Sequence, residues 1–299
     1  MNPLIRTVEV KSVVTKSNLP VSDYAVNPYV GCTHACKYCY ACFMKKFTGH
    51  AEDWGTFLDV KLWNAIKNPQ RYAGKSFFMS SVTDPYNPQE EIYRRTRTFL
   101  ETFQGVDIHL SLQTKSDLIL RDLDLIRTFK NVRVGFSINT LDENFKDDMD
   151  NAVSIERRLA AMKIFHAAGI RTTCFISPIF PGITDVAAII DAAKGFCNLV
   201  WLENLNLRGN FKPKIFAYVK EKFPQLLPLY EEIYQHKNPQ YWFELNAVVA
   251  DYAAKNHLEY VRNRDDLQRD FDAPPVIVNF FFHEQIKNTP RTFGGEAIG

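Results

Sequence analysis

The sequence has no long uncharged hydrophobic run. Its first residues, 1–16, interleave charged side chains with short apolar stretches, which argues against a secretory signal. Elsewhere no apolar stretch approaches the ~18 residues that a membrane-spanning helix needs. We therefore expect a cytoplasmic protein with no membrane partner.

The sequence also lacks a large excess of positive or negative charge. Lys and Arg total 36, Asp and Glu total 34, and the net charge is +2. Dedicated nucleic-acid-binding domains are strongly basic, so the composition does not indicate that class, although a local basic patch stays open. With 46% hydrophobic and 23% charged residues among 299, the composition is that of an ordinary globular protein.

Cysteine is scarce, because six residues in a chain of this length do not make a disulfide scaffold. Four of them fall between positions 32 and 42: Cys32, Cys36, Cys39 and Cys42. A tight group of thiols in a reducing compartment indicates metal binding before disulfide bonding. Cys174 and Cys197 stand alone in apolar runs, where free cysteine behaves as a small buried hydrophobe.

Short apolar runs alternate with amphipathic stretches over the first two thirds of the chain. Strands are predicted at 26–30, 76–82, 107–113, 131–138, 170–177 and 198–205. Helices are predicted at 117–129, 154–168 and 185–195, the second with Ser154 as its N-cap and Gly169 as its stop. Strands that each precede a helix form a parallel α/β sheet, either a βα barrel or an open doubly wound sheet. In both, ligands bind at the carboxyl ends of the strands.

The pattern changes near residue 211. Helices are predicted at 214–222, 228–235 and 241–256, and a late strand at 276–282. The tail from residue 288 contains a proline and three glycines and is expected to be flexible. We predict a first domain at 1–210 with an N-terminal lead-in, and a mainly helical C-terminal extension at 211–299.

Three of the grouped thiols, Cys32, Cys36 and Cys39, follow the first predicted strand in the spacing C-x3-C-x2-C. Such local runs of thiolates hold iron–sulfur clusters, and three thiolates leave one iron of a four-iron cluster open. Cys42 supplies a fourth thiol, enough for a closed zinc site or an electron carrier, so a non-catalytic iron–sulfur or zinc protein is one alternative. If a helix begins at Cys39, Cys42 lies about one turn further on a neighbouring face.

With Tyr38 as the aromatic residue before the third cysteine, this motif resembles the signature of the radical S-adenosylmethionine (SAM) superfamily. The resemblance implies an α/β fold, a partial (β/α)6 barrel over 1–210. It also implies a [4Fe–4S] cluster on Cys32, Cys36 and Cys39, with SAM chelated by the open iron. Reductive cleavage of SAM would give a radical that abstracts hydrogen from a substrate, with flavodoxin or ferredoxin as the reductant.

Further segments are similar to the spore photoproduct lyase-like branch and, within it, to the subgroup called radical SAM mobile pair protein B. These segments are 27–40, 83–90, 114–116 and 177–182. In the subgroup a second radical SAM protein is encoded alongside, which makes it a candidate partner. The lyases carry a hydrogen-donating cysteine where this chain has Ser80-Ser81-Val82-Thr83, which argues against thymine-dimer repair. Nucleic-acid lesion repair or modification by the same chemistry stays an alternative, and the substrate and catalytic residues are not identified.

The same resemblance assigns SAM contacts to polar residues of the cysteine loop and the strand ends. These are Tyr38, Tyr40, Asp84, Lys115, Ser137, Asn139, Arg158, Ser177 and Asn204. For Arg158 the alternative to the SAM carboxylate is a surface ion pair with Asp150 or Glu156, and for Asp84 the alternative to the SAM ammonium is a turn. We expect His34 to donate hydrogen bonds beside the cluster. Charges around Glu90 and Arg97 are read as a solvated helix face.

Overall fold

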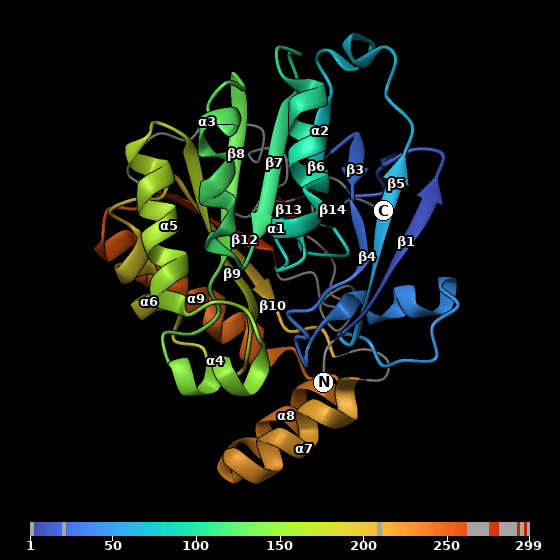
Figure 1. Cartoon of the computed structure of the whole chain (residues 1–299). Coiled ribbons are helices and arrows are strands. Elements are labelled where there is room, and N and C mark those ends of the chain that lie inside the picture. Colours follow the sequence, from blue (N-terminus) through green and yellow to red (C-terminus); the bar gives the residue numbers. More distant parts are fainter. Residues whose placement is uncertain are drawn as a thin grey trace. The chain divides into compact units, whose positions relative to one another are not determined.

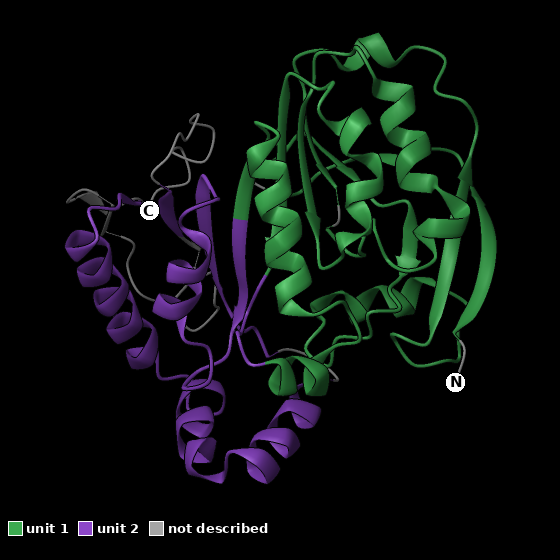
Figure 2. Ribbon diagram, turned by 60° about the vertical axis from the view of Figure 1, so that its left-hand side comes forward, with its two compact units in different colours: residues 1–137, 143–173 green, residues 138–142, 174–299 purple. Residues whose placement is uncertain are grey.

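The computed structural model describes residues 3–19, 22–79, 81–207, 211–261, 275–280, 292–293 and 296–297 (Figure 1). The chain divides into two compact units (Figure 2). Unit 1 comprises residues 1–137 and 143–173, and unit 2 comprises residues 138–142 and 174–299. The domain boundary near residue 210 stays a prediction.

Unit 1 contains a mainly parallel sheet. Its strand order is β2 (Val14–Lys16), β3 (Tyr24–Val26), β6 (Ser76–Met79), β7 (His109–Thr114) and β8 (Asn131–Ser137). Strands β3, β6, β7 and β8 run parallel, and β2 pairs antiparallel with β3. Helix α2 (Arg95–Phe103) packs on β6 through Phe99 and Phe103 against Phe77. These strands confirm the parallel α/β character that the sequence predicts.

A second, three-stranded sheet in unit 1 has the order β1 (Leu4–Val10), β5 (Phe57–Trp63) and β4 (Tyr29–Gly31). The prediction of one strand at 26–30 is therefore wrong, because β3 and β4 belong to different sheets. Asn27-Pro28 separates them, since proline has no N–H and keeps the residue before it extended. The Asn27 side chain donates from Nδ2 to Ser81 Oγ at 2.9 Å and accepts at Oδ1 from Val82 N at 3.1 Å. These two bonds hold the link between β3 and β4 in place.

The helices of unit 1 follow the predictions in part. Helix α5 (Ile155–Ala167) is confirmed, with Ser154 Oγ accepting from Arg157 N at 3.2 Å and Gly169 at φ +77° after its end. The helix predicted at 117–129 is instead a 3-10 segment, η3 (Asp117–Asp122), and one α turn, α3 (Leu123–Ile126). The other helical elements are η1 (Tyr40–Phe47), η2 (Pro69–Tyr72), α1 (Glu90–Tyr93) and α4 (Glu143–Met149).

Unit 2 contains the end of β9 (Arg171–Ile179), β10 (Leu199–Asn204), β12 (Val276–Phe280) and β11 (Tyr260–Val261). Strand β12 pairs parallel with β10, Leu199 opposite Val276, so the predicted late strand joins a βα sheet. Its helices are α6 (Val186–Ala193), α7 (Lys212–Lys222), η5 (Pro224–Leu226), α8 (Leu227–Tyr234) and α9 (Gln240–Lys255). None of the helices within the described ranges is both long and apolar enough to cross a membrane.

The predicted flexible tail falls mostly outside the described residues. Within it, β13 (Thr292–Phe293) pairs antiparallel with β14 (Glu296–Ala297). The last two residues of the strand predicted at 276–282 also lie outside the described residues.

Candidate functional site

The cysteine loop leaves β4 at a glycine that the backbone requires. Gly31 has φ +86°, and a Cβ there would lie 2.5 Å from the carbonyl oxygen of Phe57 on β5. Only glycine tolerates both the left-handed backbone and this close approach. Thr83 Oγ1 donates to the Gly31 carbonyl at 2.6 Å, so the turn into Cys32 is fixed from two sides.

The connection between α4 and α5 holds the other side of the loop. Lys37 N donates to Met149 O at 2.9 Å, and Asn151 N donates to His34 O at 2.7 Å. Ala35 has φ +50°, and Gly55 makes room for it, because a Cβ on Gly55 would lie 2.8 Å from the Ala35 Cβ. The loop is thus supported by a segment more than a hundred residues further along the chain.

The three thiols of the motif lie close enough together to interact. Burial raises the pKa of Cys32, Cys36 and Cys39, and Asp84, Cys36 and Cys39 raise that of Cys32 further. Buried thiols of this kind stay protonated unless a cation holds them as thiolates. A hydrogen bond from Trp54 to Cys39 opposes the effect of burial. Trp54 was not identified from the sequence, since it lies outside the motif and only folding brings it there.

This arrangement fits an iron–sulfur cluster. Thiolates in a short local run are its usual ligands, and sulfur ligands accept hydrogen bonds from nearby donors. The His34 side chain is 2% exposed, and its Nδ1 has no hydrogen-bond partner in the described part of the chain. A buried imidazole nitrogen without a partner beside three thiols suits a group that the protein binds there.

Cys42 follows the motif in a 3-10 helix and not in an α-helix. Element η1 is a 3-10 helix with Cys39 as its N-cap, and Cys42 N donates to Cys39 O at 3.3 Å. The Cys42 thiol lies close enough to Cys39 to raise its pKa. The expectation of a neighbouring face assumed an α-helical turn and is wrong in this respect.

Asp84 has partners on both carboxylate oxygens. Oδ1 accepts from Thr114 Oγ1 at 2.7 Å and Tyr86 N at 2.9 Å, and Oδ2 accepts from Lys115 N at 2.8 Å. His34 Nε2 lies 3.3 Å from Oδ2. Burial disfavours the charged carboxylate, but His34 and these hydrogen bonds outweigh it and lower the pKa of Asp84. The carboxylate therefore joins the cysteine loop to the end of β7, and its bond from Tyr86 N also forms a local turn, while its contact with SAM stays a prediction.

Behind the loop, a chain of polar contacts runs through Tyr38. Lys115 Nζ donates to Tyr38 Oη at 2.7 Å, and Tyr38 Oη donates to Asp150 Oδ2 at 3.0 Å. Arg158 Nη2 donates to Asp150 Oδ1 at 2.9 Å. Its Nη1 and Nε donate to the carbonyls of Ser137 at 3.1 Å and Val153 at 2.9 Å. Tyr38, Lys115, Arg158 and Ser137 are thus brought together, as predicted for residues of one site.

The surroundings of Arg158 favour a positioning role. Its side chain is 0% exposed, so the alternative ion pair with Asp150 exists but is buried and not on the surface. Three of its nitrogens already have partners, which leaves little of the guanidinium for the SAM carboxylate. Tyr40 differs, being 55% exposed, with its hydroxyl donating to the Ser81 carbonyl.

The other three predicted residues belong to unit 2. Asn139 and Asn204 are buried, and the Nδ2 of each has no partner among the described residues. Ser177 Oγ donates to Glu203 Oε2 at 2.6 Å, and burial raises the pKa of Glu203. Unsatisfied amides at strand ends are what a polar ligand would pair with.

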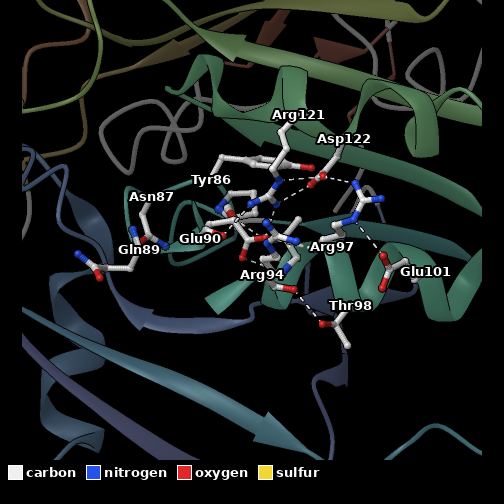
Figure 3. A network of polar contacts seen from close by, with 12 residues as sticks. Tyr86, Asn87, Gln89, Glu90, Arg94, Arg97, Thr98, Glu101, Arg121 and Asp122 are labelled. Atoms are coloured by element: carbon white, nitrogen blue, oxygen red, sulfur yellow. Dashed lines mark hydrogen bonds and ion pairs between the residues drawn. The ribbon is translucent and has the colours of Figure 1, made fainter. Parts of the chain in front are cut away.

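A second polar network in unit 1 supports the segment after Asp84 (Figure 3). Glu90 is 0% exposed and accepts from Thr96 N and Arg121 Nη2 at 2.9 and 2.8 Å. Arg97 and Arg121 both bind Asp122, at 2.7 and 2.8 Å. The interpretation of Glu90 as part of a solvated face is wrong, because Tyr29 and the arginines enclose it.

Comparison with known proteins identifies the class. The family model of the radical SAM superfamily matches residues 26–193. An uncharacterized protein of Methanocaldococcus jannaschii is 38% identical over 230 residues, covering 75% of this chain and 86% of its own. The radical SAM Nalpha-GlyT isomerase of Pseudomonas phage M6 is 25% identical over 161 residues, covering 52% of this chain and 33% of its own.

Among solved structures, a spore photoproduct lyase variant with bound AdoMet and dinucleoside spore photoproduct has a TM-score of 0.54. The sequence identity is 17%, and the match covers 74% of this chain and 66% of the lyase chain. The fold is therefore the α/β fold of radical SAM enzymes. This chain belongs to the radical SAM superfamily, whose members use an iron–sulfur cluster and SAM and need a reductant.

Proposed function

We propose that this protein reductively cleaves SAM at a [4Fe–4S] cluster held by Cys32, Cys36 and Cys39. The observation that carries the proposal is a group of three interacting thiols, Cys32 buried and Cys36 and Cys39 half-buried, in one loop with His34, whose buried Nδ1 has no partner among the described residues. Their spacing lies inside the segment that matches the superfamily. That membership favours an enzyme over the non-catalytic iron–sulfur or zinc alternative.

The cluster and SAM, when bound, would supply a 5′-deoxyadenosyl radical that abstracts hydrogen from the substrate. The chain's own residues provide the setting for it. Cys32 is buried and Cys36 and Cys39 are half-buried, which limits the access of water, and the hydrogen bond from Trp54 to Cys39 stabilises negative charge on that sulfur. Asp84 and Asp150 hold the loop through His34 and Tyr38. We propose SAM contacts for Tyr40, Ser137, Asn139, Ser177 and Asn204, and positioning roles for Tyr38, Asp84, Lys115 and Arg158.

The test is anaerobic reconstitution followed by dithionite and SAM. About four iron per chain and release of 5′-deoxyadenosine are expected from a three-cysteine site. Cys32→Ala, Cys36→Ala and Cys39→Ala should abolish both, whereas Cys174→Ala, at a buried cysteine outside the motif, should keep both. Wild-type protein that binds zinc and never cleaves SAM would contradict the proposal.

A second candidate function is the modification of nucleic acid by the same radical chemistry. The phage relative is an Nalpha-GlyT isomerase, and the lyase structure holds a dinucleoside photoproduct. Ser80-Ser81-Val82-Thr83 in place of the lyase cysteine argues against thymine-dimer repair. We expect single-stranded or modified oligonucleotides to raise 5′-deoxyadenosine formation above the substrate-free rate. No stimulation by any oligonucleotide tested would remove this candidate. A second radical SAM protein stays a proposed partner.

A further inference from the structure

Element η1 begins directly after Cys39 and carries an exposed aromatic and basic surface. Phe43 is 46% exposed and Phe47 is 68% exposed, and Lys46 between them is also exposed. Large exposed aromatic side chains close together on a protein surface mark interaction sites. We define the η1 surface as Phe43, Lys46 and Phe47.

The 3-10 geometry explains why Phe43 and Lys46 share the outside of the segment. Residues three apart eclipse one another in a 3-10 helix, so Tyr40, Phe43 and Lys46 form one row, and all three are exposed. The next row begins with Ala41, which is 2% exposed and faces inward. Phe43 is therefore turned to solvent, whereas Phe47 falls in the row of Ala41 and is exposed at the end of the segment.

The charge within this segment has one sign. From Lys37 to Gly49 the sequence contains Lys37, Lys45 and Lys46 and no Asp or Glu. Lys46 Nζ lies 4.8 Å from the Phe47 ring centroid, so positive charge and aromatic area are combined. A small aromatic centre with a basic rim suits a transient partner whose contacting surface is acidic.

We infer that the η1 surface is the docking surface for an acidic electron-donor protein that reduces the cluster, an inference that rests on the proposed function. The surface starts four residues after Cys39, so a protein seated on it is close to the cluster thiols along the chain. One electron leaves the reduced flavin or iron–sulfur centre of the donor and enters the cluster, and no atom crosses the interface. Weak electron-transfer complexes are small and electrostatically steered, which matches a surface of this size.

The test uses the reconstituted enzyme and an acidic flavodoxin. Binding of oxidised flavodoxin is measured by isothermal titration calorimetry, and its reduced form then drives 5′-deoxyadenosine formation. Lys46→Glu and Phe47→Ser should weaken binding at least tenfold and lower the flavodoxin-driven rate at subsaturating donor by a similar factor. The dithionite-driven rate should stay within twofold of wild type. Raised ionic strength should weaken wild-type binding more than binding by Lys46→Glu.

Lys163→Glu and Ile164→Ser are matched controls, because they pair an exposed lysine with an adjacent exposed apolar residue on α5. Both should bind flavodoxin as wild type does. Equal binding by all variants overturns the inference, and an equal loss of the dithionite-driven rate would show that η1 only supports the cluster.

A labelled oligothymidylate gives a second overturning outcome. Aromatic and basic side chains also bind single strands, so tight binding that Phe43→Ser abolishes, with flavodoxin binding unchanged, would reassign the surface. A wild-type enzyme that forms no 5′-deoxyadenosine with dithionite would contradict the proposed function itself, whereas the calorimetric result would still stand.

Discussion

Lys115 donates a hydrogen bond from its ammonium Nζ to the phenol oxygen of Tyr38 at 2.7 Å. Tyr38 is the aromatic residue of the cysteine motif, and Lys115 follows the end of β7, so the contact ties the loop to the sheet. Tyr38 Oη in turn donates a hydrogen bond to Asp150 Oδ2 at 3.0 Å. The aromatic position of the motif therefore acts here through its hydroxyl as well as its ring.

Tyr38→Phe should destabilise the protein while keeping the ring in place. The Lys115 side chain is 12% exposed and, among the described residues, would keep Asp150 at 3.4 Å and the face of the ring at position 38 as partners. Removing one partner of a buried charged donor costs about 1–3 kcal/mol. Thermal unfolding of the cluster-free protein should show a lower midpoint. Tyr24→Phe is the control, since that ring packs against Tyr72 and Phe77 and its hydroxyl has no hydrogen bond in the described ranges. Equal midpoints for the two variants would contradict the role given to the hydroxyl.

The buried ion pair of Arg158 and Asp150 should be costly to break from one side. The side chains are 0% and 1% exposed and lie 2.9 Å apart. Arg158→Met leaves the carboxylate buried with fewer partners, which typically costs about 3–5 kcal/mol. Urea unfolding measures the loss. The double variant Arg158→Met with Asp150→Asn should lose less than the sum of the single variants. Strict additivity would show that the two groups are not coupled.

Asp150 should also contribute to stability in a pH-dependent way. Burial disfavours its charge, but Lys115 and Arg158 outweigh burial and lower its pKa well below the ordinary value. A lowered folded-state pKa stabilises the protein above the unfolded pKa of about 4 and loses that contribution as the pH falls further. Between about pH 5 and pH 3, Asp150→Asn should therefore lose less unfolding free energy than wild type. Asp147→Asn, at a carboxylate 74% exposed, should follow wild type, and a parallel decline in all three would refute the assignment.

How well the sequence predicts a feature depends on how far apart in the chain its interacting residues lie. The helix at 154–168 is local, since Ser154 and Gly169 bound it, and it was predicted within one residue. The split of 26–30 into β3 and β4 depends on pairing with β6 and β5, which local apolar pattern does not reveal. The cysteine motif likewise predicted which thiols lie together. It did not predict that Asp150 accepts hydrogen bonds from both Tyr38 and Arg158, because only folding brings Asp150 to these two residues.

Trp54 offers a way to tune the cluster without removing a ligand. Its hydrogen bond to Cys39 stabilises negative charge on the sulfur, which favours the reduced state. Trp54→Phe should make the midpoint potential more negative by tens of millivolts, since one bond contributes about 1 kcal/mol. Redox titration followed by electron paramagnetic resonance measures the shift. Trp63→Phe is the control, because that ring contacts Arg95. An unchanged or less negative potential in Trp54→Phe would contradict the contact.

The most direct test of the three-thiolate site is the electron paramagnetic resonance spectrum of the reduced cluster with and without SAM. Cys42 lies close enough to Cys39 to raise its pKa, so geometry alone leaves a fourth thiolate within reach. We predict that SAM changes the wild-type spectrum, because the iron it chelates has no thiolate. Cys42→Ser should keep the iron content and show the same change. A wild-type spectrum indifferent to SAM, with the cluster lost in Cys42→Ser, would mean that protein fills the fourth position and would contradict the account.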